Sequence, residues 1–476
     1  MSIYMMQKEL TFGLIVGSRG FFNPKLSSEG RSTLIKTLEE AGYGYRILPV
    51  DATPNGVVET YTDAKKYAEY FRSQYADIDG LIVSLPNFGD EQGIVETISR
   101  ASLEVPVLIQ ACDDDLDKLS VELRRDAFCG KLSVCANLYQ YDIPFTLTTN
   151  HTCALDSEVF KKDVDFFARV CRVVRGLTNA RIGQIGTRPA PFQTVRYSEK
   201  LLQETGITVV PIDLSDMMAR ANALDDGAAA VKKKLDEIHG YGTVPERIET
   251  ANVLRQAKLS VAIESWLLEN ECQASAIQCW DSIQNNYGCA TCLTMSMMGE
   301  NYMPSACETD IAGVVSMYAL DLATDNPAGF MDWNNNFGSD LDKVINTHCS
   351  NYPKSFVGKD IEISELDILG ESLGRERCFG AIKGHLVPGP MTYFRLSTFD
   401  TEGRIGAYLG EGQFTDDKAE IDGGSAVCHI DRLQDLMKYI CKNGFEHHVA
   451  ISRGHYAAVL KEAIDTYLGW DLYVHE

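Results

Sequence analysis

Two carboxylates of the chain stand among small and apolar residues. Glu308 lies in the segment PSACETDIAG (304–313), and Asp332 lies in the segment GFMDWNN (329–335). Such a carboxylate must be paired, hydrogen-bonded, protonated or bound to a metal ion, because an isolated buried charge is too costly. Glu308 also precedes a run from Ile311 to Leu322 that predicts a helix, and the amino end of a helix favours negative charge. Both residues are therefore candidates for binding a metal ion or for acid–base chemistry.

Histidine is the other residue type that suits such a site. Four of the nine histidines stand in acidic or turn-rich contexts: His348, His447, His448 and His455. Spacing alone makes no site, because Glu308, Asp332 and His448 lie 24 and 116 positions apart and carry no compact signature such as HExxH. A purely structural interpretation stays open, in which Glu308 caps a helix, Asp332 bonds within a loop and His448 is a satisfied core histidine.

The first part of the chain has the rhythm of a parallel α/β sheet. Strand-like apolar runs at 12–16, 45–49, 80–84 and 105–110 alternate with helical patterns at 32–41 and 63–75. Parallel sheets bind ligands at the carboxyl ends of their strands, so the loops GSRG (17–20) and PNFGDE (86–91) are candidate site loops. Neither has the glycine spacing of a nucleotide-binding motif, and plain turns remain an alternative for both.

A second α/β segment begins near residue 178 and continues to about residue 350. From about 361 to 430, short alternating runs and turn signals such as DTEG (400–403) predict antiparallel hairpins. We therefore predict two doubly wound parallel-sheet domains followed by an antiparallel, barrel-like β-rich domain. The predicted boundaries are 1–175, 176–355 and 356–476.

Composition narrows the class of partner. The 476 residues carry a formal net charge of −23, which repels a phosphate backbone or an anionic membrane surface, so we expect neither nucleic acid nor membrane as a partner. The amino terminus lacks the pattern of a secretion signal and no window approaches the ~20 apolar residues of a membrane span, which predicts a cytoplasmic protein. The 14 cysteines are then reduced thiols, and the single CxxC at 289–292 lacks the second pair of a zinc site.

One segment is recognisable. EHHVAISRGH (446–455) resembles the closing motif of the L-fucose isomerases, where a histidine in an NHGAIS context binds the metal, and His448 is the match. ETDIAG (308–313) and FMD (330–332) resemble the family segments that hold a metal-bound glutamate and a metal-bound aspartate. The chain is identified as a member of the L-fucose and L-arabinose isomerase superfamily, in which the fold agrees with the three domains predicted above.

The resemblance implies a metal-dependent aldose–ketose isomerase. Glu308, Asp332 and His448 would bind one ion, and the two carboxylates would move a proton between C2 and C1 of an open-chain sugar through a cis-enediol. Carboxylate and imidazole donors without thiolate suit Mn²⁺, with Mg²⁺ or Co²⁺ as alternatives. His348 is a candidate fourth ligand or a partner of a ligand. Members of the family form symmetric oligomers, so we expect a homo-oligomer, a trimer or a hexamer.

Further residues are expected to contact the sugar. Polar candidates that would orient hydroxyl groups are Arg19, Asn87, Gln278 and Arg453, and flat faces for C–H surfaces are Phe88, Trp280 and Trp333. The main prediction is an L-fucose or L-arabinose type of substrate. One alternative is a sugar with an anionic C6 group, such as sulfoquinovose, bound by Arg188 or Arg453. An alternative of another class is a non-catalytic, soluble sugar-binding protein.

Overall fold

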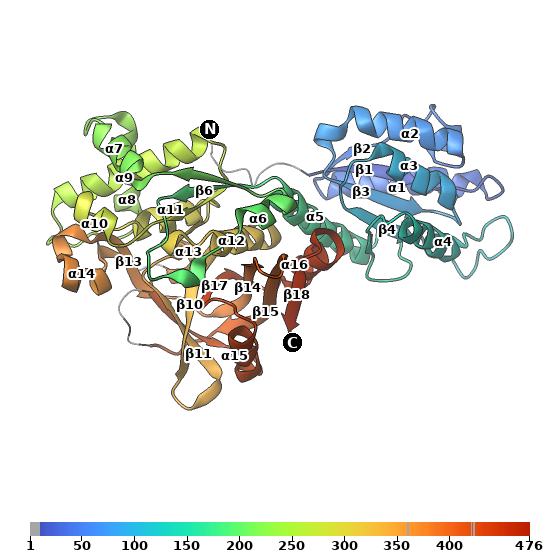
Figure 1. Cartoon of the computed structure of the whole chain (residues 1–476). Coiled ribbons are helices and arrows are strands. Elements are labelled where there is room, and N and C mark those ends of the chain that lie inside the picture. The colour runs from blue at the N-terminus through green and yellow to red at the C-terminus, as the bar shows by residue number, and fades with distance from the viewer. Residues whose placement is uncertain (1–9, 359–360, 420, 422–423) are drawn as a thin grey trace. The chain divides into compact units, whose positions relative to one another are not determined.

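The computed structural model describes residues 10–358, 361–419, 421 and 424–476 (Figure 1). The chain divides into two compact units. The amino-terminal unit runs to Arg175 and includes Glu462–Gly469, and the main unit comprises Gly176–Lys461 and Trp470–Glu476. Among the described residues, none of the helices combines the length and the apolar character that crossing a membrane requires.

The amino-terminal unit is a five-stranded parallel sheet in the order β2-β1-β3-β4-β5. Helices α2, α3 and α4 pack their apolar residues on one face, and α1 and α5 pack on the other, which is the doubly wound arrangement predicted. The strand expected at 45–49 is a three-residue edge strand. The strands are β1 (Thr11–Val16), β2 (Gly44–Arg46), β3 (Gly80–Leu85), β4 (Val107–Ala111) and β5 (Thr146–Leu147). The helices are α1 (Pro24–Glu40), α2 (Tyr61–Ser73), α3 (Glu91–Ala101), α4 (Ala127–Gln140) and α5 (Glu158–Thr178).

The main unit begins with a four-stranded parallel sheet in the order β7-β6-β8-β9. Its strands are β6 (Arg181–Ile185), β7 (Thr208–Ile212), β8 (Ala274–Ile277) and β9 (Ser305–Ala306). Its helices are α6 (Glu199–Thr205), α7 (Leu214–Ala223), α8 (Ala229–Tyr241), α9 (Thr250–Glu269), α10 (Ser282–Asn286), α11 (Cys292–Glu300) and α12 (Ile311–Thr324). Every residue of α12 is buried, which explains its continuous apolar sequence.

A nine-stranded mixed sheet follows, in the order β12-β13-β16-β11-β10-β17-β14-β15-β18. Because β15 also pairs with β16, the pairings close a circuit through β11, β10, β17 and β14, which is the barrel-like arrangement expected. The strands are β10 (Ala328–Phe337), β11 (Asp340–His348), β12 (Glu362–Glu365), β13 (Phe379–His385), β14 (Gly389–Phe399), β15 (Arg404–Phe414), β16 (Gly424–His429), β17 (His448–Arg453) and β18 (Asp471–His475). Helix α12 packs against β8 of the parallel sheet and against β14 and β17 of the mixed sheet. Its amino end therefore lies where residues of both sheets meet.

The parallel pattern ends earlier than the sequence predicts. Strands β10 and β11 form an antiparallel hairpin and belong to the mixed sheet, although they precede residue 350. The run of asparagines at 334–336, on an exposed stretch of β10, hides the strand alternation there. The division of the chain at residues 175 and 355 stays a prediction.

Candidate functional site

Three loops of the main unit meet at the carboxyl ends of parallel strands. Residues from Gly186 follow β6, Gln278 to Trp280 follow β8, and Glu308 follows β9. The backbone of Glu308 is left-handed, with φ of +53°, in the short turn Cys307–Thr309. A left-handed backbone is costly for a residue other than glycine, and such strain concentrates at functional sites. The turn aims the Glu308 side chain into a buried space beside the mixed sheet.

The mixed sheet supplies Asp332 and His448. The two residues are direct partners in the antiparallel pairing of β10 with β17. Directly opposed residues of an antiparallel pair project on the same face with their Cβ atoms about 5 Å apart, so register explains how positions 116 apart meet. His348, the last residue of β11, lies on the strand that pairs with the other side of β10.

The donor atoms converge. His448 Nε2 lies 3.7 Å from Glu308 Oε2 and 3.6 Å from Asp332 Oδ1, and His348 Nε2 lies 3.8 Å from Glu308 Oε2. Glu308 Oε2 and Asp332 Oδ1 are buried and accept no hydrogen bond from any described residue. Donors around one octahedral ion at about 2.1 Å lie about 3 Å apart when adjacent and about 4.2 Å apart when opposite. Among the described residues, two sets of donors each lie within 4.8 Å of one another, Glu308 with His348 and His448, and Asp332 with His447 and His448. His448 belongs to both sets, so a divalent cation bound to its Nε2 would lie near both carboxylates.

A buried ion-pair network orients His448. Its Nδ1 lies 2.8 Å from Asp310 Oδ2, and Asp310 also accepts from Arg395 at 2.7 and 3.2 Å. Arg395 is fully buried and donates its Nε to Glu446 at 3.1 Å. Because Asp310 holds Nδ1–H, the lone pair of Nε2 faces the site, as in a histidine that is a metal ligand.

Asp310 also caps helix α12, since its side chain accepts from the amide of Gly313 at 2.7 Å. The interpretation of Glu308 as a helix cap is therefore wrong, because Glu308 lies two residues before Asp310, which is the N-cap. Asp332 is part of strand β10, so its interpretation as a loop residue is wrong as well.

Burial and charge shift the ionisation of the site. Burial raises the pKa of Glu308. Burial would also raise the pKa of Asp310, but Arg395 and then His448 hold that pKa well below its ordinary value. Burial by itself would lower the pKa of His448. The hydrogen bond to Asp310 and the negative charge of Asp310 have a larger effect, so the pKa is raised. For His348, burial lowers the pKa, but the thiol of Cys349 and the nearby carboxylates raise it to about 9.

The hydrogen bonds of His348 distinguish it from His448. His348 Nδ1 accepts from the backbone amide of Cys349 at 2.9 Å, so a neutral ring carries its proton on Nε2. That nitrogen faces Glu308. His348 is therefore better placed to donate toward the carboxylate than to bind a cation.

The second oxygen of Glu308 is held in place. Glu308 Oε1 accepts from the indole Nε1 of Trp280 at 2.9 Å and from the thiol of Cys279 at 3.5 Å. Burial raises the pKa of Cys279 to about 12, so this thiol keeps its proton and acts as a donor. Only one carboxylate oxygen of Glu308 is therefore directed toward His448.

A pocket of about 690 Å³ adjoins these residues. Its lining comprises Thr187, Arg188, Pro189, Ala190, Pro191, Gln278, Trp280 and Asp281. The ring of Phe192 lies between this lining and the donor atoms, with centroids 5.4 Å from Trp280, 5.5 Å from His447 and 5.8 Å from His448. Gln278 Oε1 accepts from the amide of Thr187 at 3.0 Å, which joins the loops after β6 and β8. Trp280 therefore both lines the pocket and donates a hydrogen bond to Glu308.

Two residues predicted to contact the sugar are engaged elsewhere. Trp333 donates its Nε1 to the hydroxyl of Tyr408 at 2.8 Å and packs edge-on against Tyr393. Arg453 donates to the carbonyls of Val387 and Phe356. The polar groups of Trp333 and Arg453 therefore serve the packing of the barrel, and their contacts with the sugar stay predictions.

Three further candidates lie in the amino-terminal unit, which is described by itself. Arg19 bonds to Gly89 O at 2.8 Å, pairs with Glu91 and lies over the ring of Phe88 at 4.4 Å. Asn87 is buried and donates to Ser18 Oγ at 3.1 Å. The loops after β1 and β3 therefore interlock, and the sugar contacts of Arg19, Asn87 and Phe88 stay predictions.

Sequence reasoning missed residues that hold the site together. Asp310 lies in the segment quoted for Glu308, and an acidic residue directly before an apolar helical run is a cap signal. Glu446 opens the segment quoted for His448, but its role was not seen, and no pattern marked Arg395, because their partners are remote in sequence. His447, whose Nε2 lies 3.8 Å from Asp332 Oδ1, was noted only as half of a histidine pair.

Comparisons with known proteins give the same class of chemistry. Residues 13–178 match the family model described as fucose/sulfoquinovose isomerase, N-terminal domain, and residues 346–475 match L-fucose isomerase, C-terminal domain. The chain is 23% identical to the sulfoquinovose isomerase of Alkalicoccus urumqiensis over 380 residues, which cover 78% of this chain and 81% of the relative. It is 23% identical to the sulfoquinovose isomerase of Priestia megaterium over 385 residues, 79% of this chain and 81% of the relative. His348 and His448 lie in the second matched range, and Glu308 and Asp332 lie between the two.

Proposed function

We propose that this chain, which belongs to the fucose isomerase family and is an aldose–ketose isomerase, acts on an open-chain aldose with an anionic C6 group, such as sulfoquinovose. The relatives named sulfoquinovose isomerase favour this alternative over the L-fucose or L-arabinose type of substrate. The expectation of a non-catalytic sugar-binding protein is wrong, because the family consists of enzymes. The observation that carries the proposal is the convergence of His448 with two buried carboxylate oxygens that accept no hydrogen bond from the described residues.

Glu308 Oε2, Asp332 Oδ1 and His448 Nε2 would hold one divalent cation. Carboxylate and imidazole donors favour Mn²⁺, with Mg²⁺ or Co²⁺ as alternatives. When bound, the cation supplies a Lewis acid that polarises O1 and O2 of the sugar and stabilises the negative charge of the cis-enediol. His348, facing Glu308 through Nε2, would orient this carboxylate and is not needed as a ligand. A homo-oligomeric state, trimer or hexamer, stays a proposal that the resemblance implies.

The two carboxylates would carry the proton transfer. One takes the proton from C2 of the aldose and the proton returns to C1, while the hydroxyl proton of O2 passes to O1, so the aldose becomes a ketose without any gain or loss of atoms. Burial raises the pKa of Glu308, which favours a group that holds a proton during part of the cycle. Trp280 fixes the orientation of Glu308 throughout, since its indole donates to the other oxygen.

Arg188 is our candidate for the anionic group. It lines the pocket beside Trp280, is half-buried, and forms no salt bridge with any carboxylate of the described residues. Its Nη1 bonds only weakly, to the carbonyls of Pro189 at 3.3 Å and Ala190 at 3.2 Å. A guanidinium in such a place can donate two parallel hydrogen bonds to sulfonate oxygens. Asp281 lines the same pocket and would accept from sugar hydroxyls.

Replacing Arg188 by Gln should raise KM for sulfoquinovose by about 10- to 100-fold, because a hydrogen bond to a charged group contributes about 1.5–3 kcal/mol. KM for D-glucose, which has the same ring and no sulfonate, should stay within about twofold. Steady-state kinetics with both sugars measures the difference. Arg196→Gln is the matched control, since Arg196 is an exposed arginine of the same segment. Equal effects of Arg188→Gln on both sugars would contradict the assignment.

The affinity for Mn²⁺ should rise with pH. Protonated His448 cannot bind a cation, and protonated His348 repels one, and the raised pKa values keep both protonated to higher pH than usual. Binding must displace the proton of His448, so Kd should fall by up to about tenfold per pH unit while this proton is released. Loss of the charge on His348, whose pKa is raised to about 9, should strengthen binding further. Calorimetric titration in two buffers of different ionisation enthalpy counts the protons. A Kd that does not change between about pH 6 and 8 would count against the ligand set.

The function itself is tested by a panel of aldoses in deuterated water. We expect the Mn²⁺-loaded protein to convert sulfoquinovose to its ketose and to place deuterium at C1 in a fraction of the turnovers. The same protein treated with EDTA should be inactive, and readdition of Mn²⁺ should restore the reaction. If only uncharged aldoses are converted, the isomerase assignment holds and the substrate proposal is wrong.

A further inference from the structure

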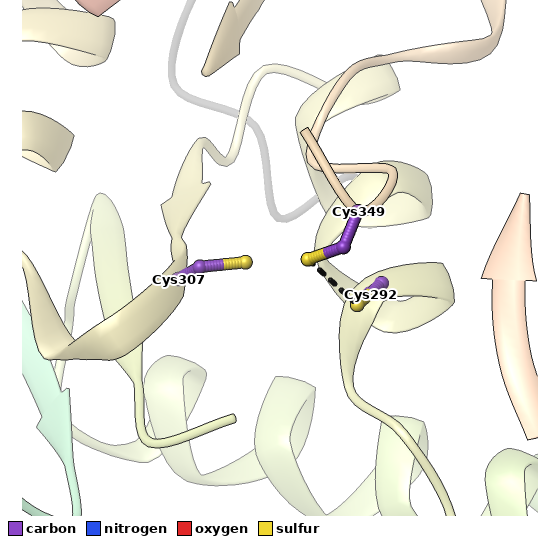
Figure 2. Close-up of side chains that lie close together, drawn as sticks. All are labelled: Cys292, Cys307 and Cys349. Carbon is purple, nitrogen blue, oxygen red and sulfur yellow. Dashed lines mark hydrogen bonds between the residues drawn. The ribbon is translucent and has the colours of Figure 1, made fainter. Parts of the chain in front are cut away.

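Three cysteines from separate segments converge next to the candidate site (Figure 2). Cys292 is the first residue of α11, Cys307 follows β9, and Cys349 follows β11. Their Sγ atoms all lie within 4.8 Å of one another, and Cys292 Sγ lies 3.8 Å from Cys349 Sγ. Figure 2 shows the three side chains pointing toward a common centre. The isomerase chemistry proposed above uses none of these thiols.

The spacing of the sulfur atoms matches a metal–thiolate site. Zn²⁺ binds thiolate sulfur at about 2.3 Å with tetrahedral geometry, which places neighbouring sulfur atoms about 3.8 Å apart. The distance between Cys292 and Cys349 has this value, and Cys307 lies within reach of the same centre. A disulfide would join two of the three thiols and would not explain why the third thiol lies beside them. Three converging thiols therefore indicate a cation more than a disulfide.

The three sulfur atoms lie in a largely buried environment that contains a further sulfur atom. Cys292 and Cys307 are completely buried, Cys349 is partly buried, and the thioether of Met295 lies 4.0 Å from Cys307 Sγ. Thiolate and thioether donors select the soft ions Zn²⁺ and Cu⁺ over Mn²⁺ and Mg²⁺. The donor types of the two neighbouring sites thus differ enough for each to hold its own class of ion.

We propose that Cys292, Cys307 and Cys349 form a second metal site, which binds one soft d¹⁰ cation such as Zn²⁺ as a tris-thiolate. On binding, each thiol loses its proton to solvent and each sulfur donates an electron pair to the ion. No oxidation occurs. Its ligands differ from those of the neighbouring carboxylate and histidine site, and the inference stands whether or not the substrate proposal is correct.

The positions of two of these cysteines in the chain indicate a structural role for the metal site. Cys307 directly precedes Glu308, and Cys349 directly follows His348. An ion held by both cysteines ties the strained turn of Glu308 to the end of β11 and to the start of α11. The soft ion would therefore act as a structural clamp that fixes two residues of the isomerase site.

Cadmium binding tests the proposal, because Cd²⁺ is a soft d¹⁰ ion whose bonds to thiolate absorb in the ultraviolet. The full-length protein is reduced, freed of metal and then saturated with Mn²⁺ before Cd²⁺ is added. We expect a thiolate charge-transfer band that grows until about one equivalent of Cd²⁺ is bound and then stops. The ¹¹³Cd resonance of this ion should be strongly deshielded, as thiolate ligation requires. Both measurements use the wild-type chain, so they do not depend on the folding of a variant.

The variants locate the site. Cys292→Ser and Cys349→Ser should each abolish the band and lower the bound Cd²⁺ by about one equivalent. Cys441→Ser, which removes an exposed thiol of α15 (Leu433–Lys442), should leave both unchanged. The proposal is overturned if the reduced wild type gives no thiolate band, or if Cys292→Ser keeps the band of the wild type. A disulfide between Cys292 and Cys349 in protein kept under reductant would overturn it as well.

Discussion

Glu308→Gln should lower kcat for the isomerisation by about 10²- to 10⁴-fold, the range that a positioned general acid or base contributes. Glutamine keeps the size of the side chain and its bond from Trp280, but it cannot take up a proton and it is a poor ligand for a divalent cation. The measurement is the rate of ketose formation at saturating Mn²⁺. The variant should stay folded, because it removes a buried charge whose Oε2 has no hydrogen-bond donor among the described residues.

Glu246→Gln is the matched control, since Glu246 is an exposed glutamate of the same unit and should keep full activity. Retention of more than about a tenth of the wild-type rate by Glu308→Gln would mean that another group moves the proton. Asp332 would then be the residue to replace next.

Arg395→Met should destabilise the main unit by about 3–5 kcal/mol, the cost of breaking a buried ion pair by removing one partner. Arg395 is fully buried between Asp310 and Glu446, so its loss leaves two buried carboxylates without their cation. All four tryptophans lie in the main unit, so the change in tryptophan fluorescence during denaturation reports on this unit. Mn²⁺ affinity should fall too, because Asp310 loses the partner that keeps it ionised beside His448.

The control is Arg404→Met on the neighbouring strand. Arg404 pairs at the surface with Glu402 and Asp471, and exposed pairs contribute about 0–1 kcal/mol. Combining Arg395→Met with Asp310→Asn and Glu446→Gln should recover part of the lost stability, because the unpaired charges disappear as well. If Arg395→Met unfolds at the same denaturant concentration as the wild type, the network does not stabilise the unit as described.

Much of the fold could be predicted from local patterns. Runs such as 12–16 and 80–84 are strands because apolar residues fill the interior of a doubly wound sheet, and the DTEG turn joins two strands because its glycine, Gly403, has φ of +67°. The β10–β11 hairpin could not be predicted in this way, since exposed polar residues replace its alternating pattern. A barrel-like domain was expected, but the strands that close it could not be predicted, because the pairing of β15 with β16 depends on the curvature of the whole sheet.

The residues of the candidate site also differ in how far the sequence could predict them. The resemblance pointed to Glu308, Asp332 and His448, and strand register together with a strained turn accounts for their proximity. Residue type suggested Trp333 and Arg453, whose sugar contacts stay predictions, because type cannot tell which face of a strand a side chain occupies when the register is unknown. The cysteine cluster was hidden because its members are 15 and 42 positions apart, whereas the visible CxxC at 289–292 contributes only one of them.

The central claim is that three remote side chains bind one divalent cation. Diffraction from crystals soaked in Mn²⁺, recorded at the manganese absorption edge, tests it without any assumption about the substrate. We predict one strong anomalous peak within about 2.0–2.4 Å of Glu308 Oε2, Asp332 Oδ1 and His448 Nε2. A peak bound by other residues, or well-ordered Glu308, Asp332 and His448 with no peak at saturating Mn²⁺, would contradict the account.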